Sequence, residues 1–165
     1  KNNNFFLKSN QLEINDLSST NKGIFITLDS HHDQNNWGIS NYIKIISKLI
    51  SHNVKIFINF SPSKLHFLEK IPKKIFDSNK VFFTHNKSIL EIIKIINHCK
   101  FVVGNETGPI CLGASLKKEV HSIYLPIHTK PESQIIKNDN FYYNADKEEN
   151  ESIIEKITSR ILKKI

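Results

Sequence analysis

The sequence predicts an α/β domain with a Rossmann-like fold, in which an open parallel sheet carries helices on both faces. Two observations predict this class. Short apolar segments rich in β-branched and aromatic residues alternate about five times with segments whose apolar residues recur at helical spacing. The short segments are apolar almost without interruption, which is typical of parallel strands covered on both faces. Such strands are joined by right-handed crossover helices.

The first half of the chain contains three of the predicted strands. They cover residues 23–28, 54–60 and 81–84. Between the first two, a helix is indicated by apolar residues at intervals of three and four, namely Ile39, Tyr42, Ile43, Ile46, Leu49 and Ile50. A weaker helix is expected over residues 63–70, behind the turn signal Ser61-Pro62.

The second half opens with a helix that starts at a capping box. Ser88 can accept a hydrogen bond from the third helical amide, while Glu91 returns to the cap. The expected apolar stripe of this helix is Ile89, Ile92, Ile93 and Ile96. Strands are then expected over residues 101–103 and 120–125, with a helix over residues 109–116 between them. A last helix, near residues 149–164, is expected to bury Ile153, Ile154, Ile157, Ile161 and Ile165.

We expect residues 21–165 to form one domain, with residues 1–20 as a connector or the remnant of an upstream region. The 165-residue chain contains no methionine and begins at Lys1, which we do not expect to be a natural start. We therefore interpret it as a piece of a longer protein. No apolar run approaches the ~20 residues that are needed to cross a bilayer.

The net charge of +7 has two interpretations. It comes almost entirely from lysine and could attract nucleotide phosphates, nucleic acid or an anionic membrane. Because the lysines are scattered, the simpler interpretation is a solvated surface that reflects a biased genome. A nucleic-acid reader more often clusters arginine with aromatic residues, and Arg160 is the only arginine, so no nucleic-acid partner is expected. Cys99 and Cys111 are too few for a disulfide scaffold or a zinc motif, which suits a reducing cytoplasm.

The strongest chemical signal is the turn after the fourth predicted strand. In open parallel sheets, ligands bind outside the carboxyl ends of the strands. This strand stops at Gly104, and a helix begins at Pro109, a residue that suits the first helical position. The free amides and dipole of the helix start form an anion site, which a phosphate can approach past Thr107 and Gly108. Glu106 either accepts hydrogen bonds from sugar hydroxyls or only complements the helix dipole.

The sequence around this turn resembles the signature of glycosyltransferase family 9, the lipopolysaccharide heptosyltransferases. Residues 102–116 read VVGNETGPICLGASL, and the usual form of the signature is V-G-N-D-S/T-G-P-M-H-L-A-A-A-L. Trp37 before the first amphipathic helix and the Tyr-Leu-Pro segment at residues 124–126 also fit the family. The resemblance covers roughly residues 22–165. It matches the C-terminal, donor-binding half of a GT-B-type transferase with two Rossmann-like domains.

The resemblance implies a transferase that moves a sugar from a nucleotide-sugar such as ADP-heptose to a lipopolysaccharide or other saccharide acceptor. By position, Glu106 contacts the donor sugar, Thr107 and Gly108 contact the phosphates, and the loop with Ser30 serves the diphosphate. The full set of expected substrate-binding residues is Asn105, Glu106, Thr107, Gly108, Ser30 and His31. The catalytic base of the family belongs to its N-terminal domain, so we assign no catalytic residue in this chain. Neither a metal ion nor a cofactor is expected.

The resemblance also implies partners and a location. The expected partners are the nucleotide-sugar, a lipid-linked saccharide acceptor and the N-terminal domain of the same protein. Relatives of full length act in the cytoplasm at the inner membrane face, and the lysine surplus is compatible with peripheral attachment there.

Several positions depart from the family pattern. Asn35 replaces a lysine that neutralises phosphate, Gly38 replaces a proline, and Cys111 replaces the signature histidine. Residues 59–64 lack the glycine and the glutamate that holds the ribose. Donor binding should therefore be weaker unless a lysine from a neighbouring loop compensates, the candidates being Lys64, Lys87 and Lys130. The alternative function is a non-catalytic or degenerate nucleotide- or sugar-phosphate-binding module.

Three further residues or groups have both a functional and a structural interpretation. The adjacent residues 31–33, His-His-Asp, rarely converge on one ion, so no metal site is expected there. Cys111 is expected in the core with Leu112 and Leu116 rather than as a thiol nucleophile. Trp37 is expected to pack the first helix onto the sheet rather than to stack on a base or sugar.

Overall fold

The computed structural model describes residues 23–30, 36–125 and 140–165, which form one sheet and the helices that flank it. The expectations for residues 1–20, His31, Asn35 and Lys130 lie outside these residues. Within the described part, no helix is both long enough and apolar enough to span a membrane.

The sheet has six parallel strands in the order β3-β2-β1-β4-β5-β6. The strands are β1 (Gly23–Thr27), β2 (Ile56–Asn59), β3 (Val81–Phe83), β4 (Cys99–Asn105), β5 (Glu119–Tyr124) and β6 (Asn140–Asn144). The chain moves outward from β1 to β3, then returns so that β4 pairs with the other side of β1. This return is a topological switch point, where the connections that follow β1 and β4 leave in opposite directions. The Rossmann-like prediction is confirmed.

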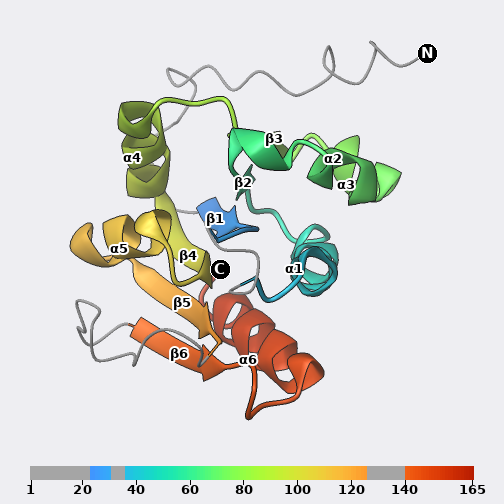
Figure 1. Cartoon of the computed structure of the whole chain (residues 1–165), viewed down its shortest axis with the longest axis vertical. Helices are drawn as coiled ribbons and strands as arrows, with labels where there is room; N and C mark the ends of the chain where they lie inside the picture. Colours follow the sequence, from blue (N-terminus) through green and yellow to red (C-terminus); the bar gives the residue numbers. More distant parts are fainter. Residues whose placement is uncertain (1–22, 31–35, 126–139) are drawn as a thin grey trace.

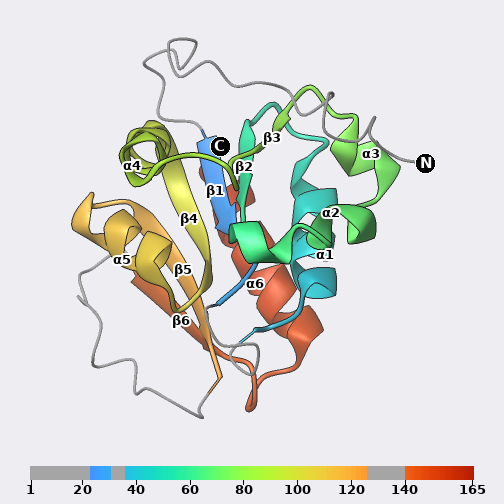
Figure 2. The same ribbon diagram turned by 45° about the horizontal axis from the view of Figure 1, so that its top comes forward.

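Helices cover both faces of the sheet (Figure 1). They are α1 (Ile39–Leu49), the short 3-10 helix η3 (Pro62–Lys64), α2 (Phe67–Lys70), α3 (Lys73–Phe76), α4 (Ile89–His98), α5 (Gly108–Ser115) and α6 (Asn150–Leu162). Helices α1 and α6 lie side by side on one face, and α4 and α5 lie on the other (Figures 1 and 2). Ion pairs between Lys44 and Glu151 and between Lys48 and Glu155 join α1 to α6 along their exposed sides.

Each face of the sheet has its own apolar core. On the side of α1 and α6, Ile24 and Ile26 of β1 pack with Tyr42, while Phe25 between them packs on the side of α4 and α5. Successive side chains of a strand point to opposite faces, so both faces must be apolar when both are covered. All five residues of β1 are buried for this reason.

The start of α4 and the position of Trp37 agree with the predictions. The capping box is present, with Glu91 N donating to Ser88 Oγ at 3.4 Å and Ser88 N donating to Glu91 Oε2 at 2.8 Å. Trp37 is 6% exposed and packs edge-on against Tyr42, 5.2 Å between ring centroids, as its structural interpretation predicted.

The structure differs from the predicted elements in four details. The helix expected over residues 63–70 is two short pieces, η3 and α2. The buried residues of α4 are Ile92, Ile95 and Ile96, while Ile89 in its first turn is 61% exposed. Ile165 is also exposed, because it follows the end of α6 at Leu162. Strand β6 was not predicted, since its sequence NFYYN begins and ends with asparagine and reads like a loop.

Cys111 corrects a further prediction, because it is exposed and the buried cysteine is Cys99. Helix α5 turns Ile110 and Gly113 toward the sheet. A Cβ atom at Gly113 would lie 2.8 Å from Cγ2 of Val102, so the backbone of α5 lies directly on β4. A neighbouring residue on a helix is rotated by about 100°. Cys111 therefore faces away from the sheet, because Ile110 and Gly113 occupy the face of α5 that lies on it.

Candidate functional site

The site lies at the carboxyl ends of β1 and β4, on either side of the switch point. The turn at residues 105–108 leaves β4 here, and the loop at residues 28–30 leaves β1 beside it. The ends of β2 and β3 extend the same edge of the sheet. Open parallel sheets bind their ligands at this place.

The turn after β4 starts α5 without a side-chain cap. Thr107 is the N-cap residue, yet its Oγ1 donates to the Asn105 carbonyl at 3.1 Å and caps none of the helical amides among the described residues. The Thr107 carbonyl accepts from Ile110 N at 3.0 Å and Cys111 N at 3.2 Å. Because these two amides are bonded and Pro109 has no amide hydrogen, Gly108 is the first residue of α5 whose amide can meet a ligand, and the helix dipole adds partial positive charge there. The turn is therefore suited to an anion.

The three glycines around this turn have different roles. A Cβ atom at Gly104 would lie 2.1 Å from Cγ2 of Thr27, and Gly113 approaches Val102 in the same way. Both glycines therefore allow close packing of the backbone. A Cβ atom at Gly108 would meet nothing within 4 Å among the residues that the structure describes. Of the three, Gly108 alone lies beside open space, which fits a position that a ligand approaches.

Glu106 lies half-buried in this turn, close to Tyr142 of β6. Burial raises the pKa of the Tyr142 hydroxyl, a hydrogen bond with the Asn140 side chain lowers it, and the negative charge of Glu106 raises it. Tyr142 pairs in register with Ser122 of β5, which in turn pairs with Gly104. Sequence reasoning missed Tyr142, because β6 itself was not recognised.

Asn105 does not present its side chain to the ligand edge. It is 1% exposed, and its Oδ1 accepts from the Tyr42 hydroxyl at 2.8 Å and from Trp37 N at 3.2 Å. Its Nδ2 donates to the Ile123 carbonyl at 3.3 Å. The structure thus gives this predicted substrate-binding residue a role inside the fold.

Ser30 begins the connection that follows β1. It is 6% exposed, and its amide donates to Oδ1 of Asn36. Beside it, Asp29 Oδ2 accepts from Ser61 N at 3.0 Å and Ser61 Oγ at 2.6 Å, which ties the end of β1 to the end of β2. His31, the next predicted ligand contact, lies outside the described residues, as do the two other residues of the His-His-Asp run.

Two aromatic rings stack at the ends of β2 and β3. The Phe60 and His85 rings lie 4.8 Å apart with 8° between their planes. Burial lowers the pKa of His85, and its buried Nδ1 has no hydrogen-bond partner among the described residues. Sequence reasoning missed this pair, because neither residue belongs to a recognisable motif.

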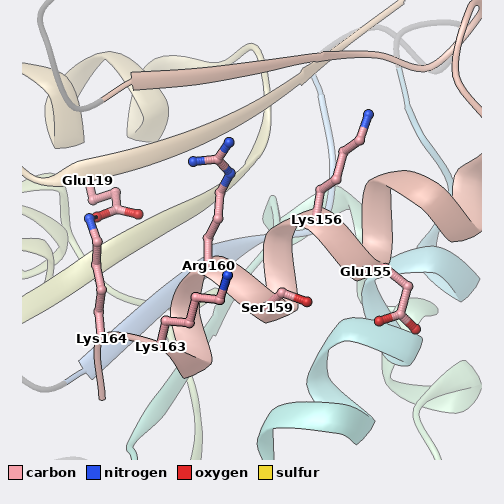
Figure 3. A pocket seen from close by; sticks show the side chains of 7 residues that line it. All are labelled: Glu119, Glu155, Lys156, Ser159, Arg160, Lys163 and Lys164. Carbon is pink, nitrogen blue, oxygen red and sulfur yellow. Dashed lines mark hydrogen bonds and ion pairs between the residues drawn. The ribbon is translucent and has the colours of Figure 1, made fainter.

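A separate open pocket of about 480 Å³ lies at the other end of the sheet, between α6 and the start of β5 (Figure 3). It is lined by Glu119, Glu155, Lys156, Ser159, Arg160, Lys163 and Lys164. Most of its charges are already paired, since Lys164 bonds Glu119, and Lys156 Nζ lies 2.6 Å from Glu148 Oε2. We therefore interpret the pocket as an ion-pair surface of α6 and place the functional site at the carboxyl ends of the strands.

Metal-ligating side chains do not gather in the described residues: His, Cys, Asp and Glu form no group of three or more there. Of the lysines proposed to replace the one missing at Asn35, Lys87 lies 3.3 Å from Glu91 Oε1, and that carboxylate holds it at the start of α4.

The comparison with known proteins identifies the family. The sequence model of glycosyltransferase family 9 (heptosyltransferase) matches residues 4–158 of this chain. The chain belongs to glycosyltransferase family 9. No curated protein matches its sequence.

Solved structures of heptosyltransferases share the fold. The E. coli heptosyltransferase WaaC with ADP-2-deoxy-2-fluoro heptose has 18% identity and a TM-score of 0.66, over 88% of this chain and 42% of its own. E. coli ADP-heptose lps heptosyltransferase II has 14% identity and a TM-score of 0.72, over 90% of this chain and 50% of its own. This family 9 chain thus spans half the length of these relatives or less.

The fold also occurs outside family 9. The UDP-GlcNAc 2-epimerase of Methanocaldococcus jannaschii, solved with UDP-GlcNAc and UDP, has 16% identity and a TM-score of 0.62. It covers all of this chain and 43% of its own. The likeness to these structures shows the fold, and the choice of reaction rests on other observations.

Proposed function

We propose that this chain is the donor-binding half of a heptosyltransferase-like enzyme. It binds a nucleotide-sugar such as ADP-heptose at the turn after β4, and the complete protein transfers the sugar to a lipopolysaccharide or another saccharide acceptor. One observation carries the proposal: in a family 9 chain, the uncapped start of α5 lies next to open space at Gly108. An anionic diphosphate is the group that this arrangement favours.

Within this proposal, the helix start acts on the leaving group. As the sugar departs, negative charge grows on the nucleoside diphosphate, and fixed amide dipoles at residues 107–108 stabilise that charge without reorganising. Glu106 accepts hydrogen bonds from sugar hydroxyls beside the phosphate, and its carboxylate lies close enough to Tyr142 to raise the pKa of that hydroxyl. The transfer needs no metal ion, and the general base comes from outside this chain.

A glycine-to-alanine pair tests the donor site. Gly108→Ala adds a methyl group in open space, so the fold stays intact while the group blocks a phosphate. We expect calorimetric titration with ADP-, UDP- and GDP-sugars to show binding of one class by the wild-type chain and at least about ten-fold weaker binding by the variant, a loss of roughly 1.4 kcal/mol. Ser115→Ala, at the exposed far end of the same helix, is the matched control. A folded wild-type chain that binds none of the three classes contradicts the proposal.

The sugar contact is tested separately. Glu106→Ala should weaken binding of the nucleotide-sugar more than binding of the bare nucleotide, because only the former carries the hydroxyls. Equal losses for both ligands would remove the sugar-binding role of Glu106 and leave the anion site in place.

A second candidate is a non-catalytic nucleotide-sugar-binding module. It is favoured by Asn35 at the position of the family lysine and by the pairing of Lys87 with Glu91. A transfer assay with the full-length protein separates the two: sugar transfer supports the enzyme, whereas donor binding without transfer supports the module.

The proposal extends to the acceptor and the location. A lipid-linked saccharide acceptor would bring the protein to the inner face of the membrane from the cytoplasm, and the net charge of +7 supports peripheral attachment there. Flotation with vesicles that contain anionic lipid should carry the protein at low salt and release it at high salt.

A further inference from the structure

We propose that Asn105 is a positioning residue, whose buried amide fixes the ligand-binding turn at residues 106–108 relative to the start of α1. This inference rests on the proposed function for the meaning of the turn. The network that carries it, however, can be tested without any ligand.

The orientation of the Asn105 amide is fully determined by its neighbours. Its Oδ1 accepts two hydrogen bonds, from the Tyr42 hydroxyl at 2.8 Å and from Trp37 N at 3.2 Å. Its Nδ2 donates to the Ile123 carbonyl at 3.3 Å. A flipped amide would direct its NH₂ group at two donors and its oxygen at a carbonyl. The side chain therefore has one arrangement in which its buried polar atoms are satisfied.

The partners of Asn105 are themselves held firmly. Tyr42 is fully buried, and burial raises the pKa of its hydroxyl, so the hydroxyl keeps its proton and remains a donor. Trp37 packs edge-on against Tyr42, and its Nε1 donates to Asn150 Oδ1 at 2.6 Å at the start of α6. Through these contacts Asn105 joins the end of β4 to the starts of α1 and α6 and to β5.

Packing contributes little at the far end of the turn that follows Asn105. A Cβ atom at Gly108 would meet nothing within 4 Å among the described residues, so side-chain packing does not fix this residue. The Thr107 hydroxyl donates to the Asn105 carbonyl at 3.1 Å. Asn105 thus holds the turn through its backbone and the neighbouring elements through its side chain. Losing the side-chain contacts should let the turn shift against α1 while the sheet remains.

The test compares two buried tyrosines. Tyr42→Phe removes only the hydroxyl that donates to Asn105. Tyr143→Phe is the matched control, since Tyr143 is 4% exposed and its hydroxyl bonds Nδ1 of His121 at 2.9 Å instead. Hydrogen exchange of the Ile110 and Cys111 amides reports on the turn, because both donate to the Thr107 carbonyl.

We expect Tyr42→Phe to speed hydrogen exchange of these two amides by about five-fold and to weaken nucleotide-sugar binding by the same factor. A five-fold change is about what the net free energy of one hydrogen bond corresponds to. Tyr143→Phe should lower the midpoint of unfolding without either effect. Unchanged exchange in Tyr42→Phe, or equal changes in both variants, would overturn the positioning role.

A charge variant gives a second, pH-dependent readout. Asn105→Asp keeps the oxygen that accepts from Tyr42 but places a second oxygen against the Ile123 carbonyl. Protonation of that carboxyl restores a donor, so exchange and affinity should return toward wild-type values as the pH falls. A defect that does not depend on pH contradicts the inference. If the wild-type chain binds no nucleotide-sugar, the proposed function fails, and the exchange rates still decide the role of Asn105.

Discussion

Gly104 and Thr27 are direct neighbours across β4 and β1, and a Cβ atom at Gly104 would lie 2.1 Å from Thr27 Cγ2 and 2.9 Å from its carbonyl oxygen. The contact involves backbone as well as side chain, so a rotamer change cannot relieve it. It lies at the switch point itself. The glycine therefore lets the ends of β4 and β1, which flank the proposed donor site, lie close together.

Gly104→Ala should accordingly damage the fold rather than the ligand contact alone. We expect a loss of about 1–3 kcal/mol in the free energy of unfolding, or a failure to fold, because overpacking forces backbone shifts. Gly108→Ala should change stability by no more than about 0.5 kcal/mol. Urea unfolding followed by circular dichroism measures both. Similar losses for the two variants would show that Gly108 is also a packing glycine.

Removal of the capping box should destabilise the protein locally. Ser88→Ala deletes the acceptor for Glu91 N and should cost about 1 kcal/mol of unfolding free energy, the usual worth of an N-cap. Ser40→Ala is the control, since Ser40 is exposed in the first turn of α1 and Gly38 is the N-cap there. In the opposite direction, Ser88 N and Ser88 Oγ donate to the Glu91 carboxylate, and these two bonds lower the pKa of Glu91 below its usual range. The stabilisation from these two bonds is therefore present above the ordinary pKa of glutamate and is lost as the pH falls through the lowered value.

The buried His121 should make the protein sensitive to acid. Burial lowers its pKa below the ordinary value of 6.5, although the Glu119 carboxylate acts in the opposite direction. As the pH falls below 6.5, the unfolded chain binds a proton at this residue and the folded chain does not, so stability falls. The slope for one proton is at most about 1.4 kcal/mol per pH unit.

Unfolding titrations between neutral and mildly acidic pH test this dependence. His121→Gln should flatten the slope, and His52→Gln, on the exposed turn after α1, controls for the loss of one histidine. An unchanged slope in His121→Gln would mean that another group, such as His85, causes the acid sensitivity.

The two cysteines should react very differently with an alkylating reagent. Cys111 is exposed, whereas Cys99 is fully buried and burial raises the pKa of its thiol strongly. Mass spectrometry should find one modified cysteine in the folded chain and two after unfolding. A bound nucleotide-sugar should slow modification of Cys111, because the Cys111 amide donates to the carbonyl of Thr107, which belongs to the turn that is proposed to bind the ligand. Equal rates with and without the ligand would place the ligand elsewhere.

The fold was predictable because the features that determine its helices and strands lie within single short segments of the sequence. Continuous apolar strands and the Ser88–Glu91 cap are visible in single segments, and the signature identified the turn at Thr107 and Gly108. The roles of individual residues in the site depend on contacts between segments that are far apart in the sequence. Asn105 lies within the signature, but its partners Tyr42 and Trp37 are distant in sequence and become neighbours only through the pairing of β1 with β4.

The remaining errors have a similar cause. Cys111 was misplaced because the prediction put the larger apolar side chains of α5 on its buried face. The backbone of α5 instead lies so close to β4 that the buried face needs a glycine, Gly113. Tyr142 and β6 were missed because an edge strand is only half covered, and its sequence lacks the continuous apolar character of the central strands.

The strand order also has a consequence for synthesis on the ribosome. Ile24 pairs with Phe101 across β1 and β4, so β1 has a free edge from the time it emerges until β4 follows it. At about 5–20 residues per second this interval lasts roughly 4–15 s. During that time the nascent half-sheet exposes both unpaired backbone and the apolar face that α4 and α5 later cover. This is the stage at which a chaperone has most to protect, and slowing translation before residue 99 should increase aggregation.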